Sequence, residues 1–184
     1  KWFNVLPLDE ALERTRLSAL PSRAAAITFD DGYADNCEVA LPILKKHGLS
    51  ATFFVATGYL DGGRMWNDTI VESIRNSRLN TLDLSKSKAF ASSQSNIFSI
   101  ESLSEKRVAI ETILGKVKYL QPTERETEIA LIAGQIGTNL PSDLMMTSEQ
   151  IIEMHRSGML IGAHTMTHPI LANLQAAEVQ AEIS

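Results

Sequence analysis

The sequence of 184 residues contains one cysteine, Cys37, and no long apolar run. A single cysteine excludes an internal disulfide framework and a cysteine-rich zinc site. We expect Cys37 to be a small buried side chain rather than a reactive thiol, because no base lies close to it in the sequence. The apolar runs are too short to cross a bilayer, and the first residues do not have the pattern of a signal peptide. No transmembrane segment is therefore predicted.

The sequence also lacks an excess of positive charge. It has 17 Lys and Arg against 22 Asp and Glu, which gives a net charge of −5 at pH 7, and its basic residues do not cluster. Binding to a nucleic-acid backbone requires such a cluster, so nucleic acid is not a predicted partner. The apolar fraction of 44% and the charged fraction of 21% are ordinary for a globular chain. We therefore treat residues 1–184 as one domain.

Strand and helix patterns alternate at both ends of the chain. Strands are predicted at 24–29, 51–56 and 159–163, and helices at 9–14, from Pro42 to Gly48, from Thr147 to Gly158, and at 174–183. The run 24–29 does not alternate between polar and apolar residues, which is typical of a parallel strand covered on both faces. The short connections around the helix at Pro42 predict a right-handed βαβ unit.

Strand patterns stop between residues 62 and 146. Three helices are predicted there, at 68–76, 101–118 and 123–136, with a Ser- and Lys-rich linker at 82–99 that we expect to be mobile or irregular. We interpret 62–146 as a helical insertion after the second strand. A capping box at Thr147 and Gln150 then starts the next helix.

Two acids and two histidines stand where predicted strands end. Asp30 and Asp31 follow the first strand, and His164 and His168 follow the last. Neighbouring carboxylates in a poorly solvated place repel each other unless a cation or a shared proton relieves them. A divalent ion on Asp31, His164 and His168 would supply that relief and leave a fourth position open for water. Asp30 could then take a proton from that water.

Each half of this pattern also has a simpler explanation. Asp30, Asp31 and Gly32 are common residues in a turn that ends a strand, and loop histidines often serve only as hydrogen-bonding groups. Pro169 disfavours a helix at His168, so we place the histidine pair across a tight loop. Both halves occur after strands, and the combination favours the metal site.

These residues resemble the polysaccharide deacetylases with a NodB-type domain, carbohydrate esterase family 4. Residues 28–32 read Thr-Phe-Asp-Asp-Gly, like the family's first motif, and residues 164–168 read His-Thr-Met-Thr-His, like its second. Segments 41–48 and 51–55 are also similar to the family's first helix and second strand. The resemblance implies an α/β fold of the irregular (β/α) barrel type.

The resemblance also implies roles for five residues. Asp30 would be the general base, and Asp31, His164 and His168 would bind a divalent metal ion, usually zinc. Cobalt or nickel could also be held, because nitrogen and oxygen ligands discriminate weakly among these ions. Thr165 would fix the loop that presents the histidines.

The family's later motifs do not occur after His168. They carry Arg and Pro, a further Asp, and the histidine that acts as the catalytic acid. We therefore expect a C-terminally incomplete barrel, a fragment with little or no deacetylase activity of its own. Missing strands would expose sheet edges and apolar surface, so we also expect the fragment to self-associate.

The resemblance implies hydrolysis of N-acetyl groups on an amino-sugar polysaccharide or oligosaccharide, in the bacterial cell envelope or outside the cell. Two alternatives remain: a hydrolase of other amides or acetyl esters, and a non-catalytic module that binds a metal or a glycan. Trp66 and Asn67 follow a Gly-Gly turn soon after the second strand. They are candidates for stacking on a sugar, with core packing as the alternative.

Overall fold

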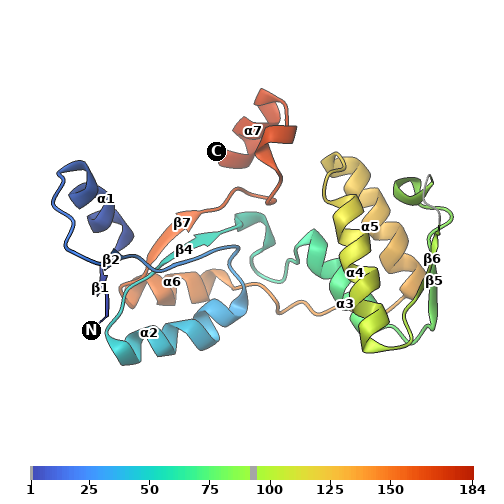
Figure 1. Cartoon of the computed structure of the whole chain (residues 1–184), viewed down its shortest axis with the longest axis horizontal. Coiled ribbons are helices and arrows are strands. Elements are labelled where there is room, and N and C mark those ends of the chain that lie inside the picture. The colour runs from blue at the N-terminus through green and yellow to red at the C-terminus, as the bar shows by residue number, and fades with distance from the viewer. Residues whose placement is uncertain (1, 92–94) are drawn as a thin grey trace. The chain divides into compact units, whose positions relative to one another are not determined.

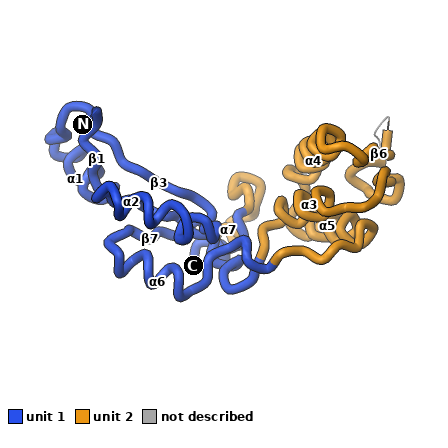
Figure 2. The backbone as a smooth tube through the Cα atoms, turned by 90° about the horizontal axis from the view of Figure 1, so that it is seen from below, with its two compact units in different colours: residues 1–63, 142–168, 180–184 blue, residues 64–141, 169–179 orange. Residues whose placement is uncertain are grey.

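The computed structural model (Figure 1) describes residues 2–91 and 95–184. The chain divides into two compact units (Figure 2). Unit 1 comprises Lys1–Gly63, Ser142–His168 and Gln180–Ser184, and unit 2 comprises Arg64–Pro141 and Pro169–Val179. The description of 1–184 as one domain with an insertion at 62–146 stays a prediction. In the described residues, no helix combines the length and the apolar character that crossing a membrane requires.

Unit 1 contains a three-stranded parallel sheet in the order β3-β4-β7. The strands are β3 (Thr28–Phe29), β4 (Thr52–Val55) and β7 (Leu160–Ala163). β4 lies between the other two, with Thr52 opposite both Thr28 and Leu160. Because all three strands are parallel, their C-terminal ends lie at one edge of the sheet. The predicted strands at 51–56 and 159–163 are confirmed.

The predicted strand at 24–29 is divided into two pieces. β2 (Ala24–Ala25) pairs with β1 (Asn4–Val5), whereas β3 pairs with β4. The two pieces therefore belong to different sheets, and residues 26–27 connect them. Thr28 is exposed, so one face of β3 is open to solvent, and β3 is also an edge strand of its sheet in the described part of the chain. The expectation of one strand covered on both faces is wrong here.

Three helices complete the larger segments of unit 1: α1 (Leu8–Arg16), α2 (Leu41–His47) and α6 (Ser148–Arg156). A short π-helical turn, η1 (Asn36–Ala40), leads into α2, which ends at Gly48 in the left-handed conformation (φ 61°). The capping box of α6 is confirmed, since the Thr147 hydroxyl accepts from Gln150 N and the Gln150 side chain accepts from Thr147 N. Helix α2 joins β3 to the parallel strand β4, as the predicted βαβ unit requires.

Side chains from β4, α2 and α6 form the core of unit 1. Phe53 is fully buried and its ring stacks on that of Phe29, with the centroids 4.7 Å apart. Leu44 and Met154 pack into the same cluster. This core fixes the strands whose ends carry the predicted site.

Cys37 lies in this core and is 7% exposed, as the sequence predicts. Burial, helped by the nearby acids Glu153 and Glu38, raises the pKa of the Cys37 thiol. Because the thiolate is the reactive form, we expect iodoacetamide to label native Cys37 at neutral pH about tenfold more slowly than it labels the protein in guanidinium chloride. Mass spectrometry follows both reactions. Equal rates in the two states would contradict this prediction.

Unit 2 contains the three predicted helices: α3 (Trp66–Arg75), α4 (Leu103–Val117) and α5 (Pro122–Ile136). Their apolar faces meet in a second core, in which Ile74, Ile113 and Ile132 are fully buried. Ser102 caps α4, and its hydroxyl accepts from Glu105 N at 3.2 Å. The predicted helices are confirmed, with ends shifted by a few residues.

The linker at 82–99 is more regular than expected. β5 (Thr81–Asp83) pairs antiparallel with β6 (Ile97–Ser99), and Leu82, Leu84 and Phe90 are buried. The alternation of apolar Leu82 and Leu84 with polar neighbours is the signal that the Ser- and Lys-rich composition concealed. Strand structure therefore does occur between 62 and 146. Residues 92–94 of this linker lie outside the described residues.

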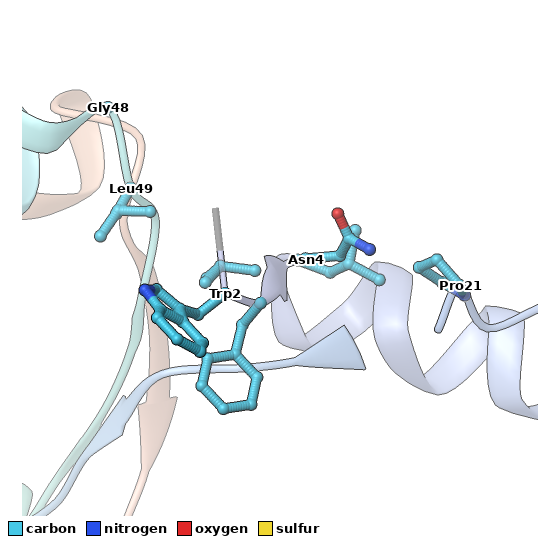
Figure 3. A pocket seen from close by; sticks show the side chains of 8 residues that line it. Trp2, Asn4, Pro21, Gly48 and Leu49 are labelled. Carbon is cyan, nitrogen blue, oxygen red and sulfur yellow. The ribbon is translucent and has the colours of Figure 1, made fainter. Parts of the chain in front are cut away.

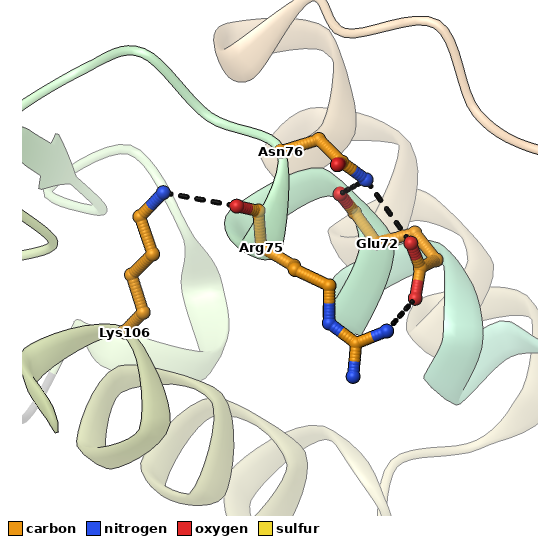
Figure 4. A network of polar contacts seen from close by, with 4 residues as sticks. All are labelled: Glu72, Arg75, Asn76 and Lys106. Atoms are coloured by element: carbon orange, nitrogen blue, oxygen red, sulfur yellow. Dashed lines mark hydrogen bonds and ion pairs between the residues drawn. The ribbon is translucent and has the colours of Figure 1, made fainter. Parts of the chain in front are cut away.

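Polar contacts tie the C-terminal end of α3 to α4 (Figure 4). Lys106 Nζ donates to the carbonyl oxygens of Arg75 and Ser77, both at 2.9 Å. Asn76 Nδ2 donates to the Glu72 carbonyl at 2.9 Å. Lys106 supplies a donor to carbonyl groups at and just beyond the end of α3, and its charge favours that end of the helix dipole. The Glu72 carbonyl also accepts from Asn76 N at 3.1 Å.

The chain ends with the short helix η4 (Leu171–Asn173) and with α7 (Ala176–Ile183). The predicted helix at 174–183 is therefore confirmed, starting two residues later. From Gln180 onward α7 belongs to unit 1.

Candidate metal centre

Asp30 and Asp31 follow β3 directly, at the C-terminal edge of the sheet. Asp31 has a φ of 74°, a conformation that few residues other than glycine adopt. Gly32 has a φ of 91°, and a Cβ atom there would lie 2.7 Å from Val55 Cγ1. The turn therefore requires glycine at position 32. Within this turn Asp31 is half-buried, whereas Asp30 is exposed.

His164 follows β7 directly, and its backbone N–H donates to the Val55 carbonyl at 2.8 Å. His168 lies four residues later, beyond a loop that has no helical structure. The Thr165 hydroxyl accepts from His168 N at 3.0 Å. Thr165 and His168 both have positive φ angles, 63° and 52°. The expected tight loop between the two histidines is confirmed.

The three predicted ligands converge on one point. Asp31 Oδ1 lies 3.3 Å from His168 Nε2 and 3.6 Å from His164 Nε2. In the described residues, Asp31, His164 and His168 form a group whose ligand atoms all lie within 4.8 Å of one another. Their side chains are 28%, 35% and 38% exposed, so solvent reaches all three.

This spacing fits a divalent ion. Zinc binds imidazole nitrogen and carboxylate oxygen at ~2.0–2.2 Å, which in tetrahedral geometry places two ligand atoms about 3.3–3.6 Å apart. The two distances from Asp31 Oδ1 fall in that range. Two nitrogens and one oxygen also suit cobalt and nickel. The residues present therefore fit the ion that the sequence predicts.

The other predicted site residues lie in different places. Asp30 is next to Asp31 in the chain but is not a member of the three-residue group. Trp66 and Asn67 begin α3 in unit 2, where Trp66 packs against the core of that unit, with the Arg125 guanidinium 4.8 Å from its ring. These contacts agree with the core-packing alternative for Trp66. A role of Trp66 or Asn67 toward a sugar stays a prediction.

Backbone N–H groups of the segment after β4 bind carbonyl groups of the histidine loop. The sequence did not predict this contact. Thr57 N donates to the Thr165 carbonyl at 3.2 Å, and Gly58 N donates to the Met166 carbonyl at 2.8 Å. A Cβ atom at Gly58 would lie 2.7 Å from the Met166 oxygen, so this close approach requires glycine. A local sequence pattern does not reveal such a contact, since the two segments are more than 100 residues apart.

A hollow of about 460 Å³ lies at the N-terminal segment of unit 1 (Figure 3). Trp2, Asn4, Pro21 and Leu49 are among the residues that line it. Its lining contains no acid, histidine or cysteine. It therefore has none of the groups that hydrolysis requires, and the aspartate and histidine cluster remains the candidate site.

The parallel sheet, with an aspartate and two histidines at the C-terminal ends of its strands, defines an α/β protein with a candidate hydrolytic metal centre. The sequence model of the polysaccharide deacetylase family matches residues 18–184. The chain belongs to this family. The resemblance that the two motifs indicated is confirmed.

One curated relative is Bacillus subtilis YxkH, whose own description as a polysaccharide deacetylase is provisional. It is 43% identical over 61 residues, which cover 30% of this chain and 22% of YxkH. The Streptococcus pyogenes deacetylase PplD, solved in complex with acetate, is similar in structure, with a TM-score of 0.50 and 19% identity over 98% of this chain and 46% of PplD. The deacetylase domain of Bordetella bronchiseptica BpsB gives a TM-score of 0.42 at 19% identity, over 89% of this chain and 39% of that one.

The likeness to PplD concerns the fold, and it confirms the expected α/β architecture of the NodB type. The chain spans less than half the length of each of these relatives.

Proposed function

We propose that the full-length protein carrying this chain is a metal-dependent hydrolase that removes N-acetyl groups from an amino-sugar polysaccharide. Membership of the polysaccharide deacetylase family supports deacetylation. The observation that carries the metal dependence is the convergence of Asp31, His164 and His168 within 4.8 Å. We propose an N-acetylated polysaccharide or oligosaccharide as the substrate, and the cell envelope or the exterior of the cell as the location.

In this proposal Asp31, His164 and His168 hold the ion, with zinc as the usual occupant. The bound ion would supply a Lewis acid for the acetyl carbonyl and would lower the pKa of a bound water toward neutral pH. Asp30, exposed and outside the ligand group, takes up the proton of the attacking water as general base. Thr165 supports His168 by accepting its backbone N–H.

The reaction forms a bond from the water oxygen to the acetyl carbon and breaks the bond from that carbon to nitrogen. The amine leaves with a proton, and acetate is the second product. We assign the donor of that proton to a residue outside this chain, in agreement with the short span of the chain along its relatives. Residues 1–184 then contain the base and the ligands without the acid. Self-association of residues 1–184 through exposed sheet edges stays a prediction, which light scattering tests.

The test measures acetate released from an N-acetylglucosamine oligosaccharide by the full-length protein and by residues 1–184. We expect the full-length protein to release acetate, a chelator to reduce the rate by about 100-fold or more, and zinc to restore it. The chain 1–184 should release little or none.

Three results would contradict different parts of the proposal. Activity that survives chelation would refute the metal dependence. Equal turnover by 1–184 and the full-length protein would refute the missing acid. A full-length protein that binds zinc without releasing acetate from this or other amides and esters would favour a binding module.

A further inference from the structure

We propose that Glu182 is a positioning residue for the metal centre. Its carboxylate holds the loop between His164 and His168 in the conformation that brings both imidazoles to Asp31. This inference rests on the proposed function, because it assumes that the two histidines bind an ion.

The loop directs its backbone N–H groups to one carboxylate. Met166 N and Thr167 N donate to Glu182 Oε2 at 2.9 and 2.7 Å, and the Thr167 hydroxyl donates to Oε1. Both carboxylate oxygens therefore accept from the loop. Hydrogen bonds to an ionised acceptor are stronger than those between neutral groups, and two parallel bonds also fix orientation.

With these bonds, two peptide groups of the loop have both their C=O and their N–H groups hydrogen-bonded to other segments. In the peptide that joins Thr165 to Met166, the carbonyl accepts from Thr57 N and the N–H donates to Glu182. In the next peptide, the Met166 carbonyl accepts from Gly58 N and the Thr167 N–H donates to Glu182. A rotation of either peptide would break a hydrogen bond on each side. Without the Glu182 carboxylate, Met166 N keeps its hydrogen bond to the Glu182 backbone carbonyl at 3.1 Å, but Thr167 N loses the oxygen that holds it.

The loop needs such a restraint because its backbone is strained. Thr165 and His168 have φ angles of 63° and 52°, in the left-handed region that disfavours side chains. Residues in such conformations persist where the surrounding contacts over-determine them. Glu182 supplies three of those contacts from a different element, α7.

The effect should fall mainly on His168. His164 is fixed by its position after β7 and by the hydrogen bond from its N–H to Val55. His168 lies at the far end of the loop, and its Nε2 is 3.3 Å from Asp31 Oδ1. A loop that relaxes toward ordinary backbone angles would move His168 away from Asp31 and leave a two-residue site.

The experiment compares Glu182→Ala and Glu182→Gln in the full-length protein. Zinc affinity is measured by competition with a chelating indicator, and the absorption spectrum of the cobalt-loaded protein reports the coordination. We expect Glu182→Ala to raise the zinc dissociation constant 10–100-fold, as is typical for groups that orient metal ligands, and to alter the cobalt spectrum. Glu182→Gln should stay within about fivefold of the wild type, because the amide oxygen still accepts from both N–H groups and the Thr167 hydroxyl can reverse its direction.

Glu178→Ala is the matched control. Glu178 lies one turn earlier in α7, and its carboxylate accepts from Gln175 N at the start of the helix. Its loss removes a charge and weakens the same helix, so we expect unchanged zinc affinity and an unchanged cobalt spectrum. An equal loss of affinity in Glu178→Ala and Glu182→Ala would overturn the proposal, since it would assign the effect to the helix as a whole.

The outcomes separate this inference from the proposed function. Wild-type affinity and an unaltered cobalt spectrum in Glu182→Ala would overturn the role of Glu182 while leaving the metal centre intact. A wild-type protein that binds neither zinc nor cobalt would instead refute the proposed function. Circular dichroism of the metal-free protein shows whether Glu182→Ala folds. If it does not, the zinc dissociation constant of Glu182→Asp tests the proposal instead. Its shorter side chain should weaken zinc binding, and an unchanged dissociation constant would overturn the proposal.

Discussion

Asp31→Asn in the full-length protein is expected to abolish zinc binding at micromolar concentrations. Asp31 supplies the one oxygen ligand of the proposed site, and its Oδ1 lies within 3.6 Å of both imidazole nitrogens. An amide is a neutral and much weaker ligand for zinc, so the loss should exceed the 10–100-fold that outer contacts produce. Competition with a chelating indicator measures it, and acetate release should disappear with the metal.

Asparagine is the better replacement at position 31 because of the backbone. Asp31 has a φ of 74°, and asparagine tolerates this region, whereas alanine adds strain that could disturb the turn. Asp31→Ala should also lose zinc, and comparison of the unfolding temperatures of the two metal-free variants separates strain from ligand loss. Zinc affinity retained in Asp31→Asn would remove Asp31 from the ligand set.

The position of the candidate site could be predicted from the sequence because two motifs, each weak alone, both follow predicted strands. β4 and β7 are short apolar runs that follow turns at Gly48 and Gly158, so their places in a parallel sheet are clear from the sequence. The carboxyl ends of parallel strands meet at one edge, and side chains just beyond those ends therefore lie close together. Asp31 and His164 are more than 130 residues apart in the chain, yet their places just after parallel strands predict that they lie at the same edge of the sheet.

Shorter elements could not be predicted in the same way. β1 and β2 are two residues long, too short for any periodicity, and they form because they pair with each other. That pairing divides the apolar run at 24–29 between two sheets. In β5 and β6, a Ser- and Lys-rich composition outweighed a real alternation around Leu82. Local composition describes the average environment of a segment and does not identify its partner.

The contacts that shape the histidine loop depend on tertiary structure. Thr165 and His168 adopt left-handed angles that neither residue type indicates. Glu182 lies in a sequence that predicts an ordinary helix, and its role becomes visible once α7 is placed beside the loop. The ligands of the proposed site are therefore predictable from motifs, and the groups that orient those ligands are not.

Asp30→Ala is expected to separate catalysis from metal binding. Asp30 is exposed and lies outside the ligand group, whereas its neighbour Asp31 faces both histidines. A positioned general base typically contributes 10²–10⁴-fold to the rate, so we expect kcat for acetate release by the full-length protein to fall by about that factor. The zinc dissociation constant should stay within about threefold of the wild type.

Asp35→Ala provides the control for the loss of one negative charge in the same segment. Asp35 is exposed and precedes η1, so we expect neither kcat nor zinc affinity to change appreciably. Loss of zinc in Asp30→Ala would show that the two neighbouring acids share the metal, and the division of roles between them would be wrong. Retained zinc with full turnover would instead place the general base elsewhere. The turn at Asp31 and Gly32 directs the Asp31 carboxylate to the histidines and leaves that of Asp30 exposed. We therefore expect opposite results for the two adjacent acids: substitution of Asp31 loses zinc, and substitution of Asp30 keeps it.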